Sequence, residues 1–202
     1  MRLQLTLAGV SPLIMHNGAA GLDTRSALSR EIAAITSKRG GNRTAVDDER
    51  LRELECHRSL YLDADDRPAL PEAALRAMIE TAARKTKQGP LVREGLMIES
   101  VRFGYDVERY GEDLEKLSKT TQFVAPVVVS RQRILRTRAM FDCPWSVVGI
   151  VDVDPELVDK DKLTAWLALG GRRVGLGDWR PEKSGHHGRF DVEEVTELPD
   201  AA

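Results

Sequence analysis

Apolar and polar residues alternate along several short segments of the chain, which predicts β-strands. The clearest pattern is that of residues 145–153. Residues 123–141 are extended, and the turn signal at 142–144 predicts a hairpin between this segment and 145–153. The predicted strands are 2–8, 59–62, 96–103, 134–141, 145–153 and 189–195.

Elsewhere, apolar residues recur three and four positions apart, which predicts amphipathic helices. Leu75, Met78 and Ile79, for example, fall on one face of the segment 73–87. Two consecutive glycines, Gly170 and Gly171, are expected to end the last helix. The predicted helices are 26–36, 47–57, 73–87 and a region that opens at 154–156 and runs to these glycines.

The order of these elements predicts the fold class. With insertions at about 17–58 and 104–125 set aside, the order is strand, helix, strand, strand, helix, strand. This is the split pattern of a ferredoxin-like, or RRM-like, sheet covered on one side by two helices. We therefore expect an α+β fold in which residues 1–202 form a single domain with a βαββαβ core, a helical insertion after strand one and a glycine-rich loop before the last strand.

Charges are separated along the chain, although the formal net charge of its 202 residues is only −2. Residues 94–115 hold seven acids against two arginines, whereas residues 131–140 hold four arginines and no acid. Residues 172–189 hold five cations against two acids. Basic regions opposed by acidic regions are compatible with nucleic-acid binding and with head-to-tail packing between copies.

The sequence also argues against several classes of protein. Cys56 and Cys143 are too few and too isolated to propose a disulfide framework or a metal site, and adjacent His186 and His187 lack further spaced ligands. Residues 3–22 carry no Asp, Glu, Lys or Arg, but their alternation and glycines indicate a strand and loop instead of a membrane span. We expect a cytoplasmic protein without cofactor, metal or membrane partner.

The most informative segment is rich in glycine and lies near the C-terminus. Residues 170–190 hold six glycines among four arginines, one lysine, two histidines and one tryptophan. Glycines let the backbone approach a ligand closely while the cations stay available, which favours a polyanion. No strand precedes the glycines and no Gly-Lys-Ser/Thr follows them, so the segment is not a nucleotide-cofactor loop. A mobile surface connection is the other interpretation.

Three features of the chain resemble the RAMP superfamily of CRISPR systems, in particular the backbone subunits that coat guide RNA. One is the ferredoxin-like order with a large insertion after strand one. The others are the strand, turn, proline and helix segment from Leu62-Asp63 through Arg67-Pro68-Ala69-Leu70-Pro71 to Ala82-Ala83-Arg84, and the loop with Gly175-x-Gly177, Gly185 and Gly188. The chain is equally similar to short phage-encoded proteins with a Met-His near the first strand, here Met15-His16, and a Gly-Asp-Trp-Arg-Pro near the end, here 177–181.

The arginines of the basic strand are the first candidate binding residues. They fall in pairs two apart, so each pair shares a strand face, and a bulge near Ile134 or Leu135 would place all four on one face as a phosphate track. Alternatively, two point to solvent and two pair with the acids of 106–115. The arginines are Arg131, Arg133, Arg136 and Arg138.

Further candidates lie in the glycine-rich loop, in the first insertion and after the first strand. Trp179 either stacks on a base or packs in the core, and core packing is favoured for Phe141. The resemblance implies a thumb-like insertion tip that touches nucleic acid or the next protomer, whereas the alternative is a basic loop that is simply solvated. His16 is expected to be structural or to contact nucleic acid, and the resemblance to RAMP ribonucleases makes a general acid or base the alternative. The resemblance also places Asp23 where target-cleaving subunits carry an acid. The remaining binding candidates are Lys38, Arg39 and Arg43 at the tip and Arg172, Arg173, Arg180 and Lys183 in the loop.

The predicted function is noncatalytic binding of single-stranded nucleic acid by copies that oligomerise along the strand as a helical filament. The resemblance implies a guide-RNA coat, with other effector-complex subunits as partners, or a phage protein on single-stranded DNA. The alternatives are a RAMP-like endoribonuclease that uses His16 and a phage assembly protein without a nucleic-acid role. Backbone contacts and stacking serve RNA and DNA alike, so both remain open.

Overall fold

The computed structural model describes residues 1–38, 40–129 and 131–199. The structure is a mixed α+β fold with two antiparallel sheets, so the predicted α+β class is confirmed. Among the described helices, none combines the length and apolar character that a membrane crossing requires.

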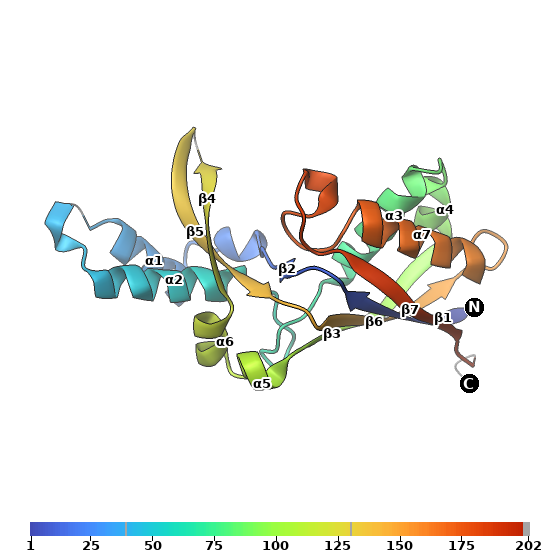
Figure 1. The fold of residues 1–202 in the computed structure, drawn as a ribbon, viewed down its shortest axis with the longest axis horizontal. Helices are drawn as coiled ribbons and strands as arrows, with labels where there is room; N and C mark the ends of the chain where they lie inside the picture. Colours follow the sequence, from blue (N-terminus) through green and yellow to red (C-terminus); the bar gives the residue numbers. More distant parts are fainter. Residues whose placement is uncertain (39, 130, 200–202) are drawn as a thin grey trace. The chain divides into compact units, whose positions relative to one another are not determined.

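Contacts divide the chain into two compact units, whose elements are drawn in Figure 1. The sheet unit comprises Met1–Ile14, Pro68–Asp106 and the chain from Phe141 onward. The hairpin unit comprises Met15–Arg67 and Val107–Met140, and most of the two predicted insertions falls within it. The single-domain interpretation stays a prediction.

The sheet unit is built on a four-stranded antiparallel sheet with two helices on one face (Figure 1). Its elements are β1 (Arg2–Gly9), β2 (Leu13–Ile14), α3 (Glu72–Arg84), α4 (Gly89–Gly95), β3 (Leu96–Tyr105), β6 (Trp145–Val153), α7 (Lys160–Arg173), η3 (Pro181–Lys183) and β7 (Phe190–Glu197). The strands lie in the order β3-β6-β1-β7. The register places the buried Leu5 of β1 beside Gly149 of β6 and Val195 of β7, so these residues share the face that the helices cover.

The hairpin unit combines a helical hairpin with a β-hairpin (Figure 1). Its elements are η1 (Ala19–Gly21), α1 (Ala27–Thr36), η2 (Gly40–Asn42), α2 (Ala45–Ser59), α5 (Val107–Tyr110), α6 (Leu114–Thr120), β4 (Gln122–Val129) and β5 (Gln132–Phe141), whose last residue belongs to the sheet unit. Ile32 and Ile35 of α1 pack with Leu51 and Leu54 of α2. This contact buries the apolar stripe that each helix carries.

The predicted hairpin between 123–141 and 145–153 is wrong. β4 and β5 pair with each other, whereas β6 lies between β3 and β1. Arg131 has a φ of 65°, in the left-handed region that tight turns use. The segment that reads as one long extended stretch therefore reverses near Arg131. In the predicted strand 59–62, Ser59 is instead the last residue of α2.

Helix α7 begins later than predicted. Asp159 caps it, because its side chain accepts a hydrogen bond from the backbone N–H of Lys162. The acidic residues at 154–156 therefore precede the helix instead of opening it, and the first helical residue is Lys160.

Helix α7 also continues through the two glycines that were expected to end it. A Cβ on Gly170 would lie 2.3 Å from Sδ of Met78, and one on Gly171 would lie 2.0 Å from the backbone oxygen of Phe190. The two glycines thus let α7 approach α3 and β7 closely. Gly175, with a φ of 76°, follows the end of the helix and donates its N–H to the carbonyl of Gly170.

Candidate functional site

The arginines of the basic strand do not form one track. Over 132–139, β5 pairs residue by residue with β4, so the predicted bulge is absent from this described segment. Arg136 and Arg138 share one face, whereas Arg133 points to the opposite face. Arg131 lies in the turn and is exposed, as is Arg133. The four-arginine phosphate track is therefore wrong, because it needs a bulge that the regular ladder lacks.

Arg136 and Arg138 instead line a cavity of about 420 Å³ within the hairpin unit. His16 lines the same cavity, together with Arg58 from the last turn of α2. Glu55, also on α2, is the one carboxylate among the described residues of the wall. The structure thus brings together three of the predicted residues with Arg58 and Glu55, which the sequence reasoning missed.

Two side chains of α2 hold the strand that carries the arginines. Glu55 Oε2 accepts a hydrogen bond from the N–H of Thr137 at 2.8 Å, and Ser59 Oγ accepts one from the N–H of Ala139 at 2.7 Å. Residues four apart on a helix are separated by about 6 Å along its axis, close to the roughly 6.6 Å between residues two apart on a strand. The two side chains therefore satisfy alternate N–H groups of β5.

Glu55 also pairs with Arg136. Its Oε1 lies 2.7 Å from Arg136 Nη1, and the Glu55 side chain is only 4% exposed whereas that of Arg136 is 35% exposed. A buried carboxylate is stable only when its oxygens are paired, and here both are used. The expectation that two arginines pair with the acids of 106–115 is wrong for Arg136, because α2 supplies the acid.

The other charged groups of the wall act on His16. Partial burial lowers the pKa of His16 below its ordinary value, and the positive charges of Arg138 and Arg58 lower it further. Burial also lowers the pKa of Arg138, because it disfavours the charged form of the guanidinium. The side chain of Arg58 has no hydrogen bond or ion pair with the residues that the structure describes. The wall therefore combines cations with an imidazole that favours its neutral form.

The cations at the insertion tip face acids from the start of α2. Lys38 Nζ lies 2.6 Å from Asp47 Oδ1, and Arg43 pairs with Asp48. The hydrogen bond from Lys38, with that from the backbone of Thr44, lowers the pKa of Asp47 to about 2. Arg39 lies outside the described residues. The two described cations of the tip are thus balanced by two neighbouring carboxylates.

The candidates of the glycine-rich loop lie in the sheet unit, whereas the cavity belongs to the hairpin unit. Arg180 pairs with Glu182 at 2.8 Å and donates to the carbonyl of Gly177. Trp179 is half-buried with its ring 6.2 Å from that of His187. The exposed cations of this region are Arg172, Arg173 and Lys183.

The glycines of this loop serve packing inside the protein. A Cβ on Gly177 would lie 2.4 Å from the carbonyl oxygen of Ile14, and one on Gly188 would lie 1.8 Å from that of Leu176. The N–H of Gly188 donates to Pro12, and Leu176 donates to Gly188. These backbone groups are therefore engaged within the sheet unit, so close packing inside the protein explains why glycine occupies these positions without invoking a ligand.

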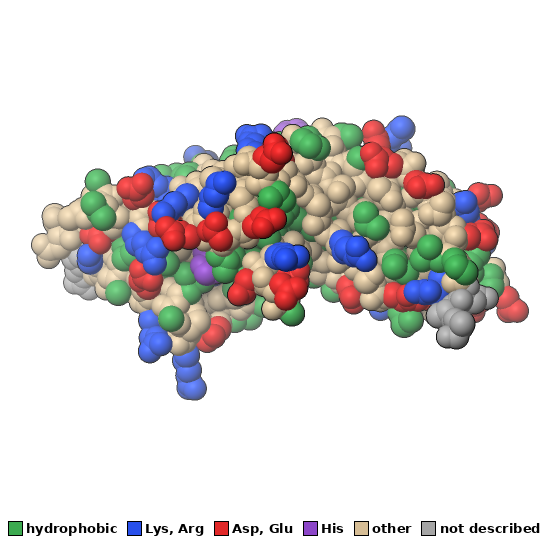
Figure 2. All heavy atoms as spheres, turned by 90° about the horizontal axis from the view of Figure 1, so that it is seen from below, with side chains coloured by type: hydrophobic (Ala, Val, Ile, Leu, Met, Phe, Trp, Pro, Cys, Tyr) green, Lys and Arg blue, Asp and Glu red, His purple; other side chains and the backbone are tan. Residues whose placement is uncertain are grey.

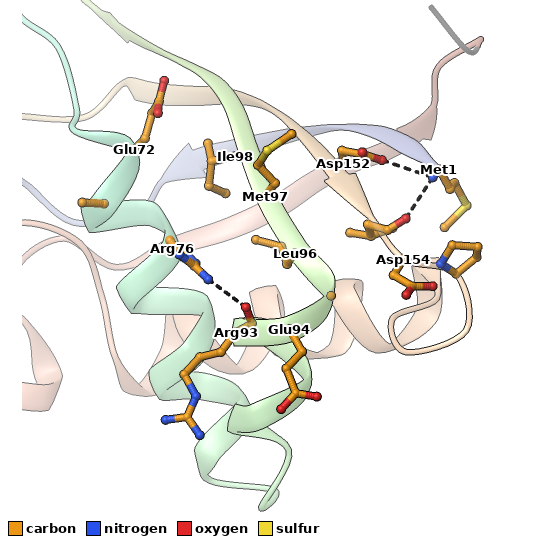
Figure 3. Close-up of a pocket in the computed structure, with 14 residues that line it drawn as sticks. Met1, Glu72, Arg76, Arg93, Glu94, Leu96, Met97, Ile98, Asp152 and Asp154 are labelled. Atoms are coloured by element: carbon orange, nitrogen blue, oxygen red, sulfur yellow. Dashed lines mark hydrogen bonds and ion pairs between the residues drawn. The ribbon is translucent and has the colours of Figure 1, made fainter.

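A larger cavity, of about 770 Å³, lies in the sheet unit (Figure 3). Arg76 points to the backbone carbonyl of Arg93 at 3.0 Å, and the N-terminal ammonium of Met1 lies 3.2 Å from the carboxylate of Asp152. The arginines face several acids, so this wall favours no anion. The carboxylates that line it are Glu72, Glu94, Asp152 and Asp154.

Surface charge and comparison add no other site. Figure 2 shows Lys and Arg side chains interspersed with Asp and Glu on the face it displays, so this face carries no continuous basic surface. No group of three or more His, Cys, Asp or Glu side chains is placed to hold a metal ion within the described residues. No protein-family model matches the chain, and the search of curated proteins gave no match.

Proposed function

We propose that this protein binds single-stranded nucleic acid and that the cavity of the hairpin unit holds the phosphate backbone. The observation that carries the proposal is the charge of the cavity wall, which is lined by His16 and by the three arginines Arg58, Arg136 and Arg138 but by only one carboxylate among its described residues, the buried Glu55. Guanidinium groups match phosphate oxygens as two-point donors. Phosphate contacts dominate the affinity of proteins for nucleic acid, so this wall favours a polyanion over a neutral ligand.

The cavity favours one strand and no particular sequence. A volume of about 420 Å³ suits one nucleotide unit and is too small for a duplex. Asn17, the amide on the wall, donates from Nδ2 to the carbonyl of Leu60, and its Oδ1 accepts from the N–H of Ala20. Its hydrogen bonds are thus directed within the protein instead of to a base edge. Phosphate contacts alone carry no sequence information, so RNA and DNA both fit.

The topology of the sheet unit supports a ferredoxin-like core and, with it, a relationship to the RAMP superfamily. Along the chain the elements are β1, α3, β3, β6, α7 and β7, and the antiparallel strands lie in the order β3-β6-β1-β7. This combination agrees with the split βαββαβ pattern that we propose for the core. Phe103 and Tyr105 of β3 are in register with the buried Val147 and Trp145 of β6, so the two rings lie on the side of the sheet that the helices cover. The proposal therefore does not assign base stacking to these rings on the opposite face of the sheet.

We extend the proposal to assembly in the cytoplasm. One cavity accommodates few nucleotides, so useful affinity for a long strand requires neighbouring copies to bind side by side. Heterologous contacts between copies that do not close on themselves build helical filaments. Separate acidic and basic segments of the chain, 94–115 and 131–140, offer opposite charges for such contacts.

One observation favours a second candidate function, a metal-independent endoribonuclease. His16 lies on the cavity wall with Arg58 and Arg138, whose charges favour its neutral imidazole. A neutral imidazole can accept the proton of a ribose 2′-hydroxyl, and guanidinium groups can stabilise the negative charge that develops on the phosphate. Cleavage of a hairpin RNA in EDTA, lost in His16→Ala, would favour this function.

Binding measured by fluorescence anisotropy tests the main proposal, with single-stranded RNA, single-stranded DNA and duplex of about 16 nucleotides as probes. Arg58→Glu combined with Arg138→Glu should weaken binding to both single strands and lower the slope of log K against log salt by about 0.7 per lost phosphate contact. Arg52→Glu is the matched control, because Arg52 is an exposed arginine of α2 outside the cavity wall. Parent-like binding by the double variant at every salt concentration would show that phosphate binds elsewhere.

A further inference from the structure

We infer that Glu55 acts as an internal counter-ion that withholds Arg136 from the bound strand, so that Arg58 and Arg138 are the arginines of the cavity that contact phosphate. The inference rests on the proposed function and identifies which cations of the same cavity the ligand uses. It makes Glu55 a determinant of how many phosphate contacts the site offers.

The geometry ties the Glu55 carboxylate in place at both oxygens. Oε2 accepts from the N–H of Thr137, and Oε1 accepts from Arg136 Nη1. The side chain is 4% exposed, so it cannot turn to solvent without leaving the buried N–H of Thr137 unsatisfied. A phosphate therefore cannot displace Glu55 from Arg136 at little cost, as it could displace an exposed carboxylate.

A phosphate on Arg136 would also approach a buried negative charge. Like charges repel strongly where little water separates them, and Glu55 is such a charge. Arg138 lines the same cavity from the same strand face, and an incoming anion would favour its charged form, which burial disfavours. Arg58 has no ion pair with the described residues, so phosphate binding there breaks none.

Charge-neutral variants separate these roles. Glu55→Gln keeps an amide oxygen that can accept from Thr137 N–H but removes the negative charge, so Arg136 should become an additional phosphate contact. The variant should bind oligo(U) or oligo(dT) of about 16 nucleotides more tightly than the parent at low salt. An additional contact steepens the salt slope by about 0.7, so this advantage should shrink about 2.6-fold between about 50 and 200 mM salt.

Arg136→Gln is the complementary variant, because it removes the positive charge of Arg136 while keeping a polar side chain at that position. In the parent background it should leave the salt slope unchanged, whereas in the Glu55→Gln background it should remove the gained contact. Arg138→Gln is the matched control on the same strand face and should lower the slope by about 0.7 in both backgrounds.

The outcomes distinguish the inference from the proposed function. If Arg136→Gln lowers the parent's slope as much as Arg138→Gln does, the inference is overturned while the phosphate site stands. If neither Arg138→Gln nor Arg58→Gln changes the slope, the proposed site itself fails, and the inference with it. Circular dichroism checks folding of each variant. Should Glu55→Gln not fold, Arg136→Gln in the parent background still tests the inference. A withheld Arg136 predicts an unchanged salt slope, whereas a phosphate contact predicts a slope lower by about 0.7.

Discussion

Replacing Gly171 by alanine tests how closely α7 packs on β7. A Cβ built on Gly171 lies 2.0 Å from the backbone oxygen of Phe190 and 3.0 Å from its ring carbon Cδ2. Ordinary contacts begin near 3.4 Å, so the helix and the strand would have to separate locally by about 1.4 Å. The obstructing atom belongs to the backbone of a strand paired with β1, and the Phe190 side chain is only 1% exposed. Neither the backbone nor the ring can move freely.

The expected effect is the difference between two opposing terms. Overpacking a core costs about 1–3 kcal/mol, occasionally more, whereas alanine gains about 1 kcal/mol over glycine inside a helix. Because the clash is with backbone, we expect Gly171→Ala to lower the free energy of unfolding by about 2 kcal/mol and the Tm by about 4–8 °C. Gly170→Ala is the matched control: it meets the flexible side chain of Met78, with Sδ at 2.3 Å, so we expect a change within about 1 kcal/mol.

Urea denaturation followed by circular dichroism measures both variants, and an unchanged m value shows that the same transition is compared. If the two glycines merely ended the helix, as the sequence suggested, alanine at either position would meet no backbone clash, and Gly171→Ala would not be the more costly substitution of the two. A Gly171→Ala protein as stable as the parent would refute the close packing of α7 on β7. It would also remove the physical reason for glycine at that position.

Three further predictions concern binding. Burial and the charges of Arg138 and Arg58 lower the pKa of His16, and a bound phosphate would offset these arginine charges and raise that pKa. Binding should therefore favour protonated His16, so affinity for oligo(U) should rise as the pH falls from about 7.5 to 5.5. The same pH profile in His16→Asn as in the parent would contradict this. Trp179→Ala should lose about 1–3 kcal/mol of affinity with little change in Tm if the ring stacks on a base, whereas a large fall in Tm with unchanged affinity would assign the ring to the core. Deletion of 37–44 should leave a folded protein that binds without cooperativity. In the parent, mass photometry that showed one stoichiometry on strands of every length would rule out the filament.

Sequence patterns predicted the fold best where local and tertiary requirements agree. Strand 2–8 and helix 73–87 were predicted within three residues of β1 and α3, because their apolar residues recur with the period of the element that buries them. The C-terminal boundary of α7 was missed for a tertiary reason. Gly170 and Gly171 resemble a helix stop, yet close contact with Met78 and Phe190 explains them. Such contacts join residues that are far apart in the sequence, so a local pattern cannot predict them.

The candidate site could be predicted only in part, for a related reason. Arg136 and Arg138 were identified from the charge pattern and His16 with the help of the family resemblance, but Glu55 lies 81 residues from Arg136 in the sequence. A signal for Glu55 was nevertheless present. Leu51, Glu55 and Ser59 follow one another at intervals of four, and all three are buried. Polar residues that continue the apolar stripe of a helix indicate buried partners elsewhere in the chain.

Helix α2 decides which predicted cations remain available, and it does so in two physically different ways. The pair of Lys38 with Asp47 is at the surface, with 41% of the lysine side chain exposed. Such pairs contribute little and weaken with salt, so phosphate can exchange for the carboxylate. The pair of Arg136 with Glu55 has a carboxylate that is 4% exposed, and phosphate cannot replace it without leaving a buried N–H group unsatisfied. A count of cations along the sequence treats the two arrangements alike, whereas burial makes the first reversible and the second a fixed part of the fold.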